Sequence, residues 1–178
     1  MHDVPNDGIT TGEIVVRAPW LTKGYMGNLK ASNDLWSNGY LHTGDVGYIR
    51  ENGSLQVTDR LKDVIKTGGE WISSLTLENI ASSCSGVEEV AAIGIPNEKW
   101  GERAVLVAKL MNNAEPDLVR QDLMRKFREH VESGEISKWA IPNHIFFVEQ
   151  LPKTSVGKLD KKAIRKNVLT LKDTSNDR

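Results

Sequence analysis

Two apolar runs decide how this sequence folds: VEEVAAIGI at residues 87–95 and RAVLVAKLM at residues 103–111. Both runs are short and rich in valine, isoleucine and alanine, and Pro96 follows the first of them directly. A continuous apolar run of this length is typical of a strand that is buried on both faces. The two runs therefore predict two buried strands within a folded domain.

The segments around these runs alternate between helix and strand patterns. Apolar residues recur at helical spacing in residues 75–83 and 116–131. Short strands are predicted at residues 61–66 and 144–148, and a basic helix at residues 160–168. The order strand, helix, strand, strand, helix, strand, helix describes a compact α+β domain with a small mixed sheet.

The first third of the chain has the character of β structure. Residues 12–17 form a short β-branched run, and Pro19 stops it. Residues 46–50 and 54–58 flank an Asn-Gly pair, which is a strong hairpin signal because both residues tolerate a positive φ. The intervening stretch GYLHTGD at residues 39–45 is predicted to be a loop that carries polar groups.

A change of character near residues 59–62 divides the chain into two parts. The boundary contains Arg60, Lys62 and Asp63, which is too polar for a connection through a core. We therefore expect a β-rich part at residues 1–59, an alternating α/β part at residues 60–170, and a disordered polar tail at residues 171–178.

Composition excludes several classes of protein. The net charge of −1 gives no reason to expect nucleic acid or an anionic membrane as a partner. No run of about 18 apolar residues is present, so no transmembrane segment is expected. Cys84 is the only cysteine and cannot form an internal disulfide, which favours a reducing cytoplasm. It lies in an apolar-periodic stretch, where a buried small residue is the simpler explanation than a nucleophile.

A basic loop motif, PKTSVGK at residues 152–158, is the clearest local feature. Gly157 permits a tight turn, so Lys158 can project from the tip of a loop. A lysine ammonium on a long stem is suited to bridging a carboxylate and a phosphate. On the residues alone, a solvated basic loop before a basic helix is the alternative.

Two further stretches carry polar groups in patterns that suit ligand binding. Asp45 follows Thr43 and Gly44, and a carboxylate beside a glycine can accept hydrogen bonds from a ribose diol; the alternative is an ordinary turn aspartate. In the stretch DRLKDVIKTGGEWIS at residues 59–73, paired glycines let the backbone pass close to a ligand, and Trp71 offers a flat face. The alternative for this stretch is a surface strand followed by a turn.

Taken in this order, the motifs resemble the adenylate-forming superfamily of acyl-CoA synthetases, adenylation domains and luciferases. Residues 40–45 match its aromatic-x-x-Thr-Gly-Asp signature, residues 59–69 its hinge signature and residues 152–158 its lysine-loop signature. Gly12-Glu13-Ile14 with Gly24-Tyr25 resembles an upstream motif of the same family. The resemblance covers residues 12–166.

The details resemble the medium- and long-chain fatty acyl-CoA synthetases. Residues 68–74 followed by Leu77-Glu78-Asn79, and the stretch KWGER at residues 99–103, are similar to that branch. Two departures are Ser74, where a proline is usual, and Thr76, where a glutamate is usual. They speak against the amino-acid adenylation domains and suit the fatty acyl branch.

The resemblance implies a two-step reaction, in which a carboxylate attacks the α-phosphate of ATP and coenzyme A then displaces AMP. It implies that Lys158 neutralises the charge that develops in the first step. It implies that Asp45 and Arg60 bind the ribose and phosphate oxygens, and that Val57 packs near the nucleotide.

The resemblance also implies domain alternation. Lys62 matches the hinge, about which residues 60–170 rotate as a mobile lid on the large adenylation domain, whose β-rich end is residues 1–59. After rotation, the pantetheine of coenzyme A is expected to meet the lid at four residues: Gly68, Gly69, Glu70 and Trp71.

The remaining expectations concern what lies outside these motifs. The phosphate loop and the acyl pocket of the family are absent, so the sequence is expected to be a fragment that needs an upstream adenylation domain. Mg²⁺ is expected with ATP through a ligand outside this chain, and no metal-ligand spacing occurs within it. The alternatives are a non-catalytic lid, a module that binds a nucleotide or a partner without chemistry, and a ligase that loads an acyl-carrier phosphopantetheine. The oligomeric state and acyl chain length stay open.

We expect the isolated chain of 178 residues to give no fatty-acid-dependent exchange between ATP and pyrophosphate, because it contains no phosphate loop. The exchange of labelled pyrophosphate into ATP measures this directly. The expectation would be contradicted if the isolated chain catalysed this exchange and the Lys158→Ala substitution abolished it.

Overall fold

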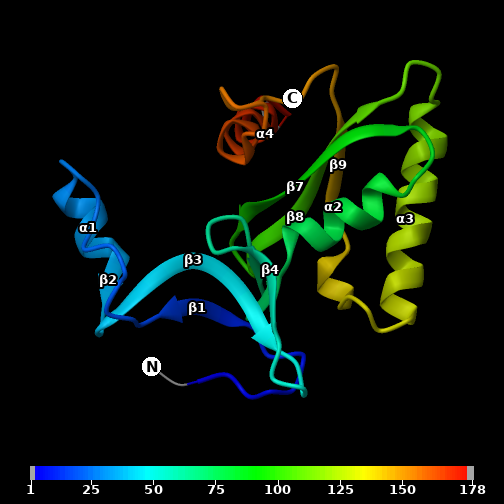
Figure 1. Cartoon of the computed structure of the whole chain (residues 1–178). Helices are drawn as coiled ribbons and strands as arrows, with labels where there is room; N and C mark the ends of the chain where they lie inside the picture. Colours follow the sequence, from blue (N-terminus) through cyan, green and yellow to red (C-terminus); the bar gives the residue numbers. More distant parts are fainter. Residues whose placement is uncertain (1–2, 176–178) are drawn as a thin grey trace. The chain divides into compact units, whose positions relative to one another are not determined.

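The computed structural model divides the chain into two compact units, Met1–Lys62 and Asp63–Arg178. It describes residues 3–175, and the backbone alone for residues 171–175. The first unit contains, in chain order, β1 (Gly12–Val16), α1 (Leu29–Leu35), β2 (Trp36–Ser37), β3 (Tyr40–Ile49) and β4 (Leu55–Arg60) (Figure 1). The second unit contains β5 (Ile65–Thr67), β6 (Glu70–Ile72), α2 (Ser74–Ser82), β7 (Val87–Asn97), β8 (Gly101–Leu110), α3 (Pro116–Glu132), the 3₁₀ helix η1 (Lys138–Ala140), β9 (His144–Phe147) and α4 (Lys161–Ser175).

Strand β3 organises the first unit, because β1, β2 and β4 all pair with it in antiparallel fashion. The predicted strand at residues 12–17 and the predicted hairpin are confirmed as β1 and as β3–β4. The prediction of a loop at residues 39–45 is wrong, because Tyr40 to Asp45 belong to β3. Backbone pairing on both edges holds this polar segment in a strand without an apolar pattern.

The first unit differs from the prediction in the position of its Asn-Gly turn and in the presence of helix α1. Between β3 and β4, Gly53 alone has a positive φ, of 81°. The two-residue turn with positive φ at both positions is instead Asn38-Gly39, at 53° and 80°, which joins β2 to β3. Helix α1 was not predicted, since none of its residues is buried and it has no apolar stripe.

Strand β8 organises the second unit. It pairs with β7 along its length and with β9 in parallel (Figure 1). It also pairs with β5 at one end. The predicted α+β class with a mixed sheet is confirmed. The strand predicted at residues 61–66 begins later, at Ile65. The first apolar run continues as a strand through Pro96, which an edge strand such as β7 tolerates.

Helices cover both faces of this sheet. On one face α2 and α3 pack against alternate residues of β7 and β8, among them Ala92 and Leu106. On the other face α4 packs against the intervening residues, among them Ile93 and Val107. The three predicted helices are thus confirmed, and α4 extends beyond the prediction to Ser175. Residues 171–175 of the expected disordered tail are the last residues of α4, and residues 176–178 lie outside the described residues.

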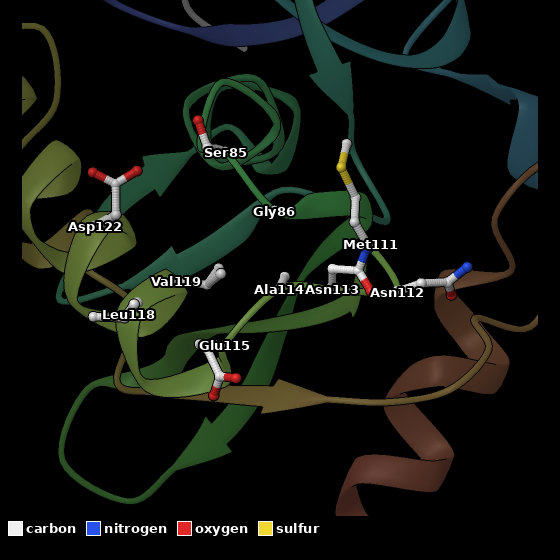
Figure 2. A pocket seen from close by; sticks show the side chains of 10 residues that line it. All are labelled: Ser85, Gly86, Met111, Asn112, Asn113, Ala114, Glu115, Leu118, Val119 and Asp122. Carbon is white, nitrogen blue, oxygen red and sulfur yellow. The ribbon is translucent and has the colours of Figure 1, made fainter.

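An open hollow of about 650 Å³ lies beside the start of α3 (Figure 2). It is bounded by Ser85 and Gly86 after α2, by the loop that follows β8, and by the first two turns of α3. Leu118 is 65% exposed at its rim. None of the residues singled out from the sequence lines this hollow.

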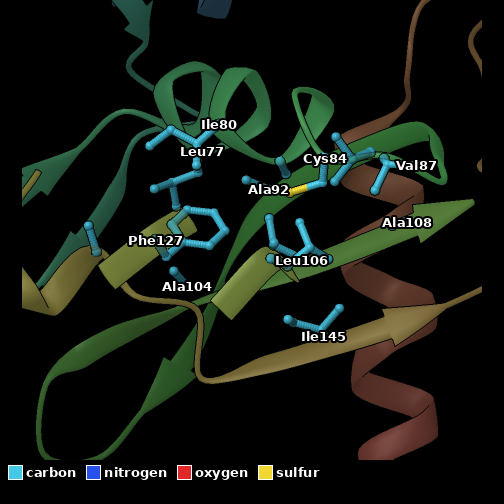
Figure 3. Close-up of a cluster of buried hydrophobic side chains, with 14 of the residues drawn as sticks. Leu77, Ile80, Cys84, Val87, Ala92, Ala104, Leu106, Ala108, Phe127 and Ile145 are labelled. Carbon is cyan, nitrogen blue, oxygen red and sulfur yellow. The ribbon is translucent and has the colours of Figure 1, made fainter. Parts of the chain in front are cut away.

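The main core lies under α2 and α3 (Figure 3). Phe127 and Leu106 are fully buried in it, and Cys84 belongs to the same cluster with 3% of its surface exposed. The expectation that Cys84 is a buried small residue is confirmed. Within residues 3–175, no helix has the length and apolar character needed to cross a bilayer.

We expect the Cys84 thiol to resist modification in the folded protein. Burial raises the pKa of Cys84 from 9.0 to about 11, and the nearby Asp122 carboxylate adds to the rise. At pH 8 the thiolate is therefore about 100-fold scarcer than in the unfolded chain. The rate at which Ellman's reagent modifies Cys84 is measured in native and in denaturing buffer. Equal rates in the two buffers would contradict the burial of the thiol.

The same shift predicts a loss of stability in alkali. The folded state favours the neutral thiol, so Cys84 has no effect on the free energy of unfolding below about pH 9 and lowers it as the pH rises toward 11. The Cys84→Ala variant serves as the control, because it lacks this contribution to the pH dependence.

Candidate active site

Lys158 lies in a tight loop between the buried residue Leu151 and α4. The N–H of Thr154 donates to the Lys158 carbonyl at 2.7 Å, and the N–H of Gly157 donates to the Thr154 carbonyl at 2.9 Å. At the base of the loop, the Asp160 N–H donates to the Pro152 carbonyl at 2.9 Å. The loop is therefore closed by its own backbone, and its direction depends on how its two ends are held.

The side chain of Lys158 differs from its basic neighbours in having no partner. Lys153 forms an ion pair with Glu89 at 2.5 Å, and Lys161 forms one with Glu78 at 2.7 Å. Among the described residues, Lys158 is exposed and no ion pair reaches its ammonium. A free ammonium on a fixed loop is available to an anionic ligand.

A two-residue turn at Gly68-Gly69 joins β5 to β6, with Thr67 paired to Glu70. The φ angles of the two glycines are 58° and 88°, which side chains with a Cβ adopt at a cost. The Gly68 N–H donates to the Trp100 carbonyl at 2.9 Å, and a Cβ on Gly68 would lie 3.4 Å from the Trp100 ring. The pair of glycines thus makes a hairpin turn that lies against Trp100.

Glu102 fixes the strand that leads into this turn. Its carboxylate accepts a hydrogen bond from the Lys66 N–H at 2.8 Å and occupies the space above Gly94. A Cβ on Gly94 would lie 2.6 Å from that carboxylate, so a larger residue there would displace it. The glycine turn is therefore held to β8 by contacts that do not involve the Lys158 loop.

A small hollow of about 200 Å³ lies beside the glycine turn. Glu70 and Trp71 line one side of it, and Ser137 lines another. Trp71 is 38% exposed, and the Lys66 ammonium lies 5.2 Å from the centre of its ring. Among the described residues, the buried hydroxyl of Ser137 has no hydrogen-bond partner, so it is available to a polar ligand that enters the hollow.

Two tryptophans that sequence reasoning did not assign to a site meet beside the same turn. The rings of Trp100 and Trp139 have centroids 4.5 Å apart and are tilted by 41°. Lys99 lies 4.9 Å from the Trp100 ring centre, and Lys138 and Arg103 lie 5.0 Å and 6.0 Å from that of Trp139. Flat aromatic faces among three cations suit a ligand that has an aromatic base and phosphates.

In the first unit, Thr43, Gly44 and Asp45 form a bulge in β3. Between the pairs Glu13–Val46 and Val15–His42, these three residues lie opposite one residue of β1. The Thr43 hydroxyl donates to the Ile14 carbonyl at 2.7 Å and accepts from the Asp45 N–H at 3.0 Å. The bulge takes Asp45 out of the regular strand pattern, a device that often re-aims a side chain next to a site.

Asp45 and Arg60 are brought together across β3 and β4. The Arg60 Nε lies 2.7 Å from the Asp45 Oδ1, and the side chains are 62% and 30% exposed. Val57 lies on β4 with Arg60, is paired with Gly47 and is 52% exposed. All three are accessible from solvent.

Lys62 is exposed in the turn that follows β4 and is the last residue of the first unit. The site residues therefore fall into two sets. Asp45, Val57 and Arg60 belong to the first unit with Lys62 at its end, whereas the glycine turn and Lys158 belong to the second. In the described part of the chain, no group of three or more His, Cys, Asp or Glu side chains could hold a metal ion.

Comparison with known proteins gives a family match within the second unit and relatives that align with both units. Residues 76–158 match the model of the AMP-binding enzyme C-terminal domain. The chain is 39% identical over 163 residues to a long-chain-fatty-acid–CoA ligase of Thermus thermophilus, an alignment that covers 91% of this chain and 29% of the relative. The chain thus spans less than a third of the length of this curated relative.

Solved structures show the same fold. An amide bond synthetase, McbA from Marinactinospora thermotolerans, superimposes with a TM-score of 0.74 at 30% identity, covering 93% of this chain and 32% of McbA. The o-succinylbenzoate CoA synthetase of Bacillus subtilis, in complex with an acyl-adenylate intermediate, superimposes with a TM-score of 0.74 at 29% identity, covering 89% and 31% of the two chains.

Proposed function

Because the chain carries an AMP-binding enzyme C-terminal domain at residues 76–158, we propose that it acts as the C-terminal part of an AMP-forming fatty acid–CoA ligase. The whole protein would activate a fatty acid with ATP and transfer the acyl group from the acyl-adenylate to coenzyme A. The observation that carries this proposal is Lys158, a free ammonium on a backbone-closed loop within a chain similar to acyl-CoA ligases.

The surface of the first unit supports the proposal that this unit is one end of a larger adenylation domain. Among residues 3–62, Val46 is the only large apolar side chain that is buried. Large apolar side chains are instead exposed along the unit: Ile9, Val16, Trp20, Tyr25, Met26, Leu29, Leu55 and Val57. An exposed apolar surface of this kind is typical of an interface. We propose that residues 1–59 are the β-rich end of that domain.

In the first half-reaction, Lys158 would lie between the fatty acid carboxylate and the α-phosphate of ATP. Attack of a carboxylate oxygen on the phosphorus forms the mixed anhydride and expels pyrophosphate. Two anions must approach each other in this step, and a fixed ammonium stabilises the charge that accumulates between them. The backbone hydrogen bonds of the loop support this role, because they limit the reorganisation of Lys158 during the reaction.

The ribose and phosphates of the nucleotide would be bound by the first unit. Asp45 would accept hydrogen bonds from the ribose hydroxyls, Arg60 would donate to ribose or phosphate oxygens, and Val57 would pack against the nucleotide. The pairing of Asp45 with Arg60 supports this assignment, since it holds an acceptor and a cationic donor at one place on the sheet.

The second half-reaction would follow rotation of the lid, residues 60–170, about Lys62. The pantetheine thiol of coenzyme A would then reach the acyl-adenylate past Gly68, Gly69, Glu70 and Trp71 and displace AMP. The glycine turn supports this role because it carries no side chains that would narrow the passage. The free Ser137 hydroxyl in the adjacent hollow is suited to a pantetheine amide.

The tryptophan pair favours coenzyme A over a carrier protein as the acyl acceptor. The nucleotide end of coenzyme A has an adenine and three phosphates, which match the Trp100–Trp139 faces and the cations around them. A carrier-bound phosphopantetheine has no adenine to stack. Assays of the complete protein with both acceptors would separate the two.

The proposal also covers the metal ion, the substrate class and the location of the protein. ATP would be used with Mg²⁺, whose protein ligand would lie outside this chain, because the described residues offer no metal-binding cluster. Fatty acids are proposed as substrates from the similarity to a long-chain-fatty-acid–CoA ligase. A cytoplasmic location is proposed because the lone cysteine needs no oxidising compartment.

We expect Lys158→Ala to lower the rate of fatty-acid-dependent ATP–pyrophosphate exchange by about 100-fold or more in the complete protein that contains this chain. Thioester formation from supplied acyl-adenylate is expected to stay within about threefold, because Lys158 is not used in that step. Ser155→Ala, in the same exposed loop, serves as the matched control. Equal losses in both half-reactions would remove Lys158 from its proposed role.

A separate expectation concerns the acceptor. Trp139→Ala should raise the KM for coenzyme A by about 10-fold, since one stacking face is lost, and should leave ATP–pyrophosphate exchange unchanged. Trp139→Phe keeps an aromatic face and should recover most of the affinity. An unchanged KM in the alanine variant would count against the tryptophan pair as the nucleotide site.

A further inference from the structure

A nearly buried ion pair lies next to the Lys158 loop. The ammonium of Lys161, the first residue of α4, lies 2.7 Å from Glu78 Oε1 and donates to the Ser74 hydroxyl at 2.6 Å. The side chains of Lys161 and Glu78 are only 12% and 13% exposed, and Ser74 is fully buried. This differs from an ordinary surface pair, because solvent screens it weakly.

Glu78 is fixed independently of Lys161. Its Oε1 also accepts a hydrogen bond from the Ala92 N–H, at 2.8 Å, on strand β7. The carboxylate therefore joins three elements: α2, which carries it, β7, which donates to it, and α4, whose first residue donates an ammonium. A charged hydrogen bond to an acceptor that is already held has a defined direction.

The loop depends on its ends for its direction. Lys153, at the start of the loop, pairs with Glu89, but these side chains are 45% and 31% exposed. Lys161, at the end, is three residues from Lys158 and is anchored in the better shielded pair. The Lys158 carbonyl, the Thr154 N–H and the base of the loop are bonded within the loop itself. The loop is therefore closed by its own backbone, and of the two ion pairs at its ends the Lys161–Glu78 pair is the better shielded from solvent.

The glycine turn is held by different groups. The Trp100 carbonyl, the Glu102 carboxylate and the pairing of β5 with β6 fix it, and none of these contacts includes Lys161 or Glu78. Loss of the Lys161–Glu78 ion pair should therefore disturb the Lys158 loop and leave the glycine turn in place.

We infer that Lys161 is a positioning residue: through its pair with Glu78 it sets the direction in which Lys158 is presented to the reacting carboxylate and α-phosphate. This inference rests on the proposed function. It assigns a role in catalysis to a side chain that touches no substrate. Displacement of a catalytic group by about 1 Å can lower a rate on the order of 100-fold, so the anchor need move only slightly to matter.

The test uses the complete protein and measures both half-reactions with their KM values. Lys161→Met is expected to lower the kcat of ATP–pyrophosphate exchange by about 30-fold, with the KM for ATP and thioester formation from supplied acyl-adenylate within about threefold. Lys161→Arg keeps the charge and should recover the rate to within about threefold. Lys162→Met is the matched control, because Lys162 is an exposed neighbour on the same helix.

A merely structural role gives a different pattern. It predicts that both half-reactions fall together, in proportion to the folded fraction measured by circular dichroism, and this outcome would overturn the inference. An exchange rate in Lys161→Met equal to that in Lys162→Met would overturn it as well.

If Lys161→Met does not fold, Glu78→Gln takes its place. The amide oxygen can still accept from the Ala92 N–H, whereas the charge that holds Lys161 is lost. A selective drop of about 10-fold in exchange supports the inference, and an unchanged rate overturns it. Absence of any exchange in the wild-type protein overturns the proposed function together with the inference, whereas wild-type exchange that survives both substitutions overturns the inference alone.

Discussion

The antiparallel ladder between β7 and β8 is the constraint on which the second unit depends. Its ten pairs run from Val87–Leu110 to Asn97–Gly101, and both of its faces are buried. Successive side chains point to opposite faces, so one face supports α2 and α3 while the other supports α4. Burial on both faces requires apolar residues at nearly every position, which leaves the polar chemistry to the ends and loops of the ladder.

The glycine turn and the Lys158 loop are each attached to this ladder, by different contacts. The glycine turn is attached at the β7–β8 turn, through the Trp100 carbonyl and Glu102. The Lys158 loop is attached to the face of the ladder that α4 covers. Leu151 before the loop and Ile164 after it are buried there with Ile93 and Val107. The proposed function requires the Lys158 loop and the glycine turn to move together as parts of one rigid body, and the ladder connects them.

The sequence predicted the second unit well because its signals are local. Residues 87–95 and 103–111 have the apolar runs that are typical of buried strands, and the helices have clear apolar stripes. The first unit was harder. Tyr40 to Asp45 have no apolar pattern and become a strand through pairing with β1, β2 and β4. The Asn38-Gly39 turn carries the same Asn-Gly signal that predicts the later hairpin, but no hairpin was predicted there. Of the site, the motif residues were named in advance, whereas the contact between Trp100 and Trp139 joins positions 39 residues apart and has no local signal.

The same reasoning explains why the sequence does not predict a buried ion pair at Lys161. As a lysine in a basic helix it has the pattern of a solvated residue, and only the fold places Glu78 and Ser74 around it. The Lys161 ammonium is 12% exposed and loses much of its hydration. Its opposite charge and its hydrogen bonds must therefore offset the cost of that desolvation. Here the carboxylate has a second fixed donor, the Ala92 N–H, and the ammonium has a second acceptor, the Ser74 hydroxyl. Ser74 stands at a position where proline is usual in the adenylate-forming superfamily that the sequence resembles. Proline has no hydroxyl to accept this bond, so the hydrogen bond from Lys161 depends on the serine.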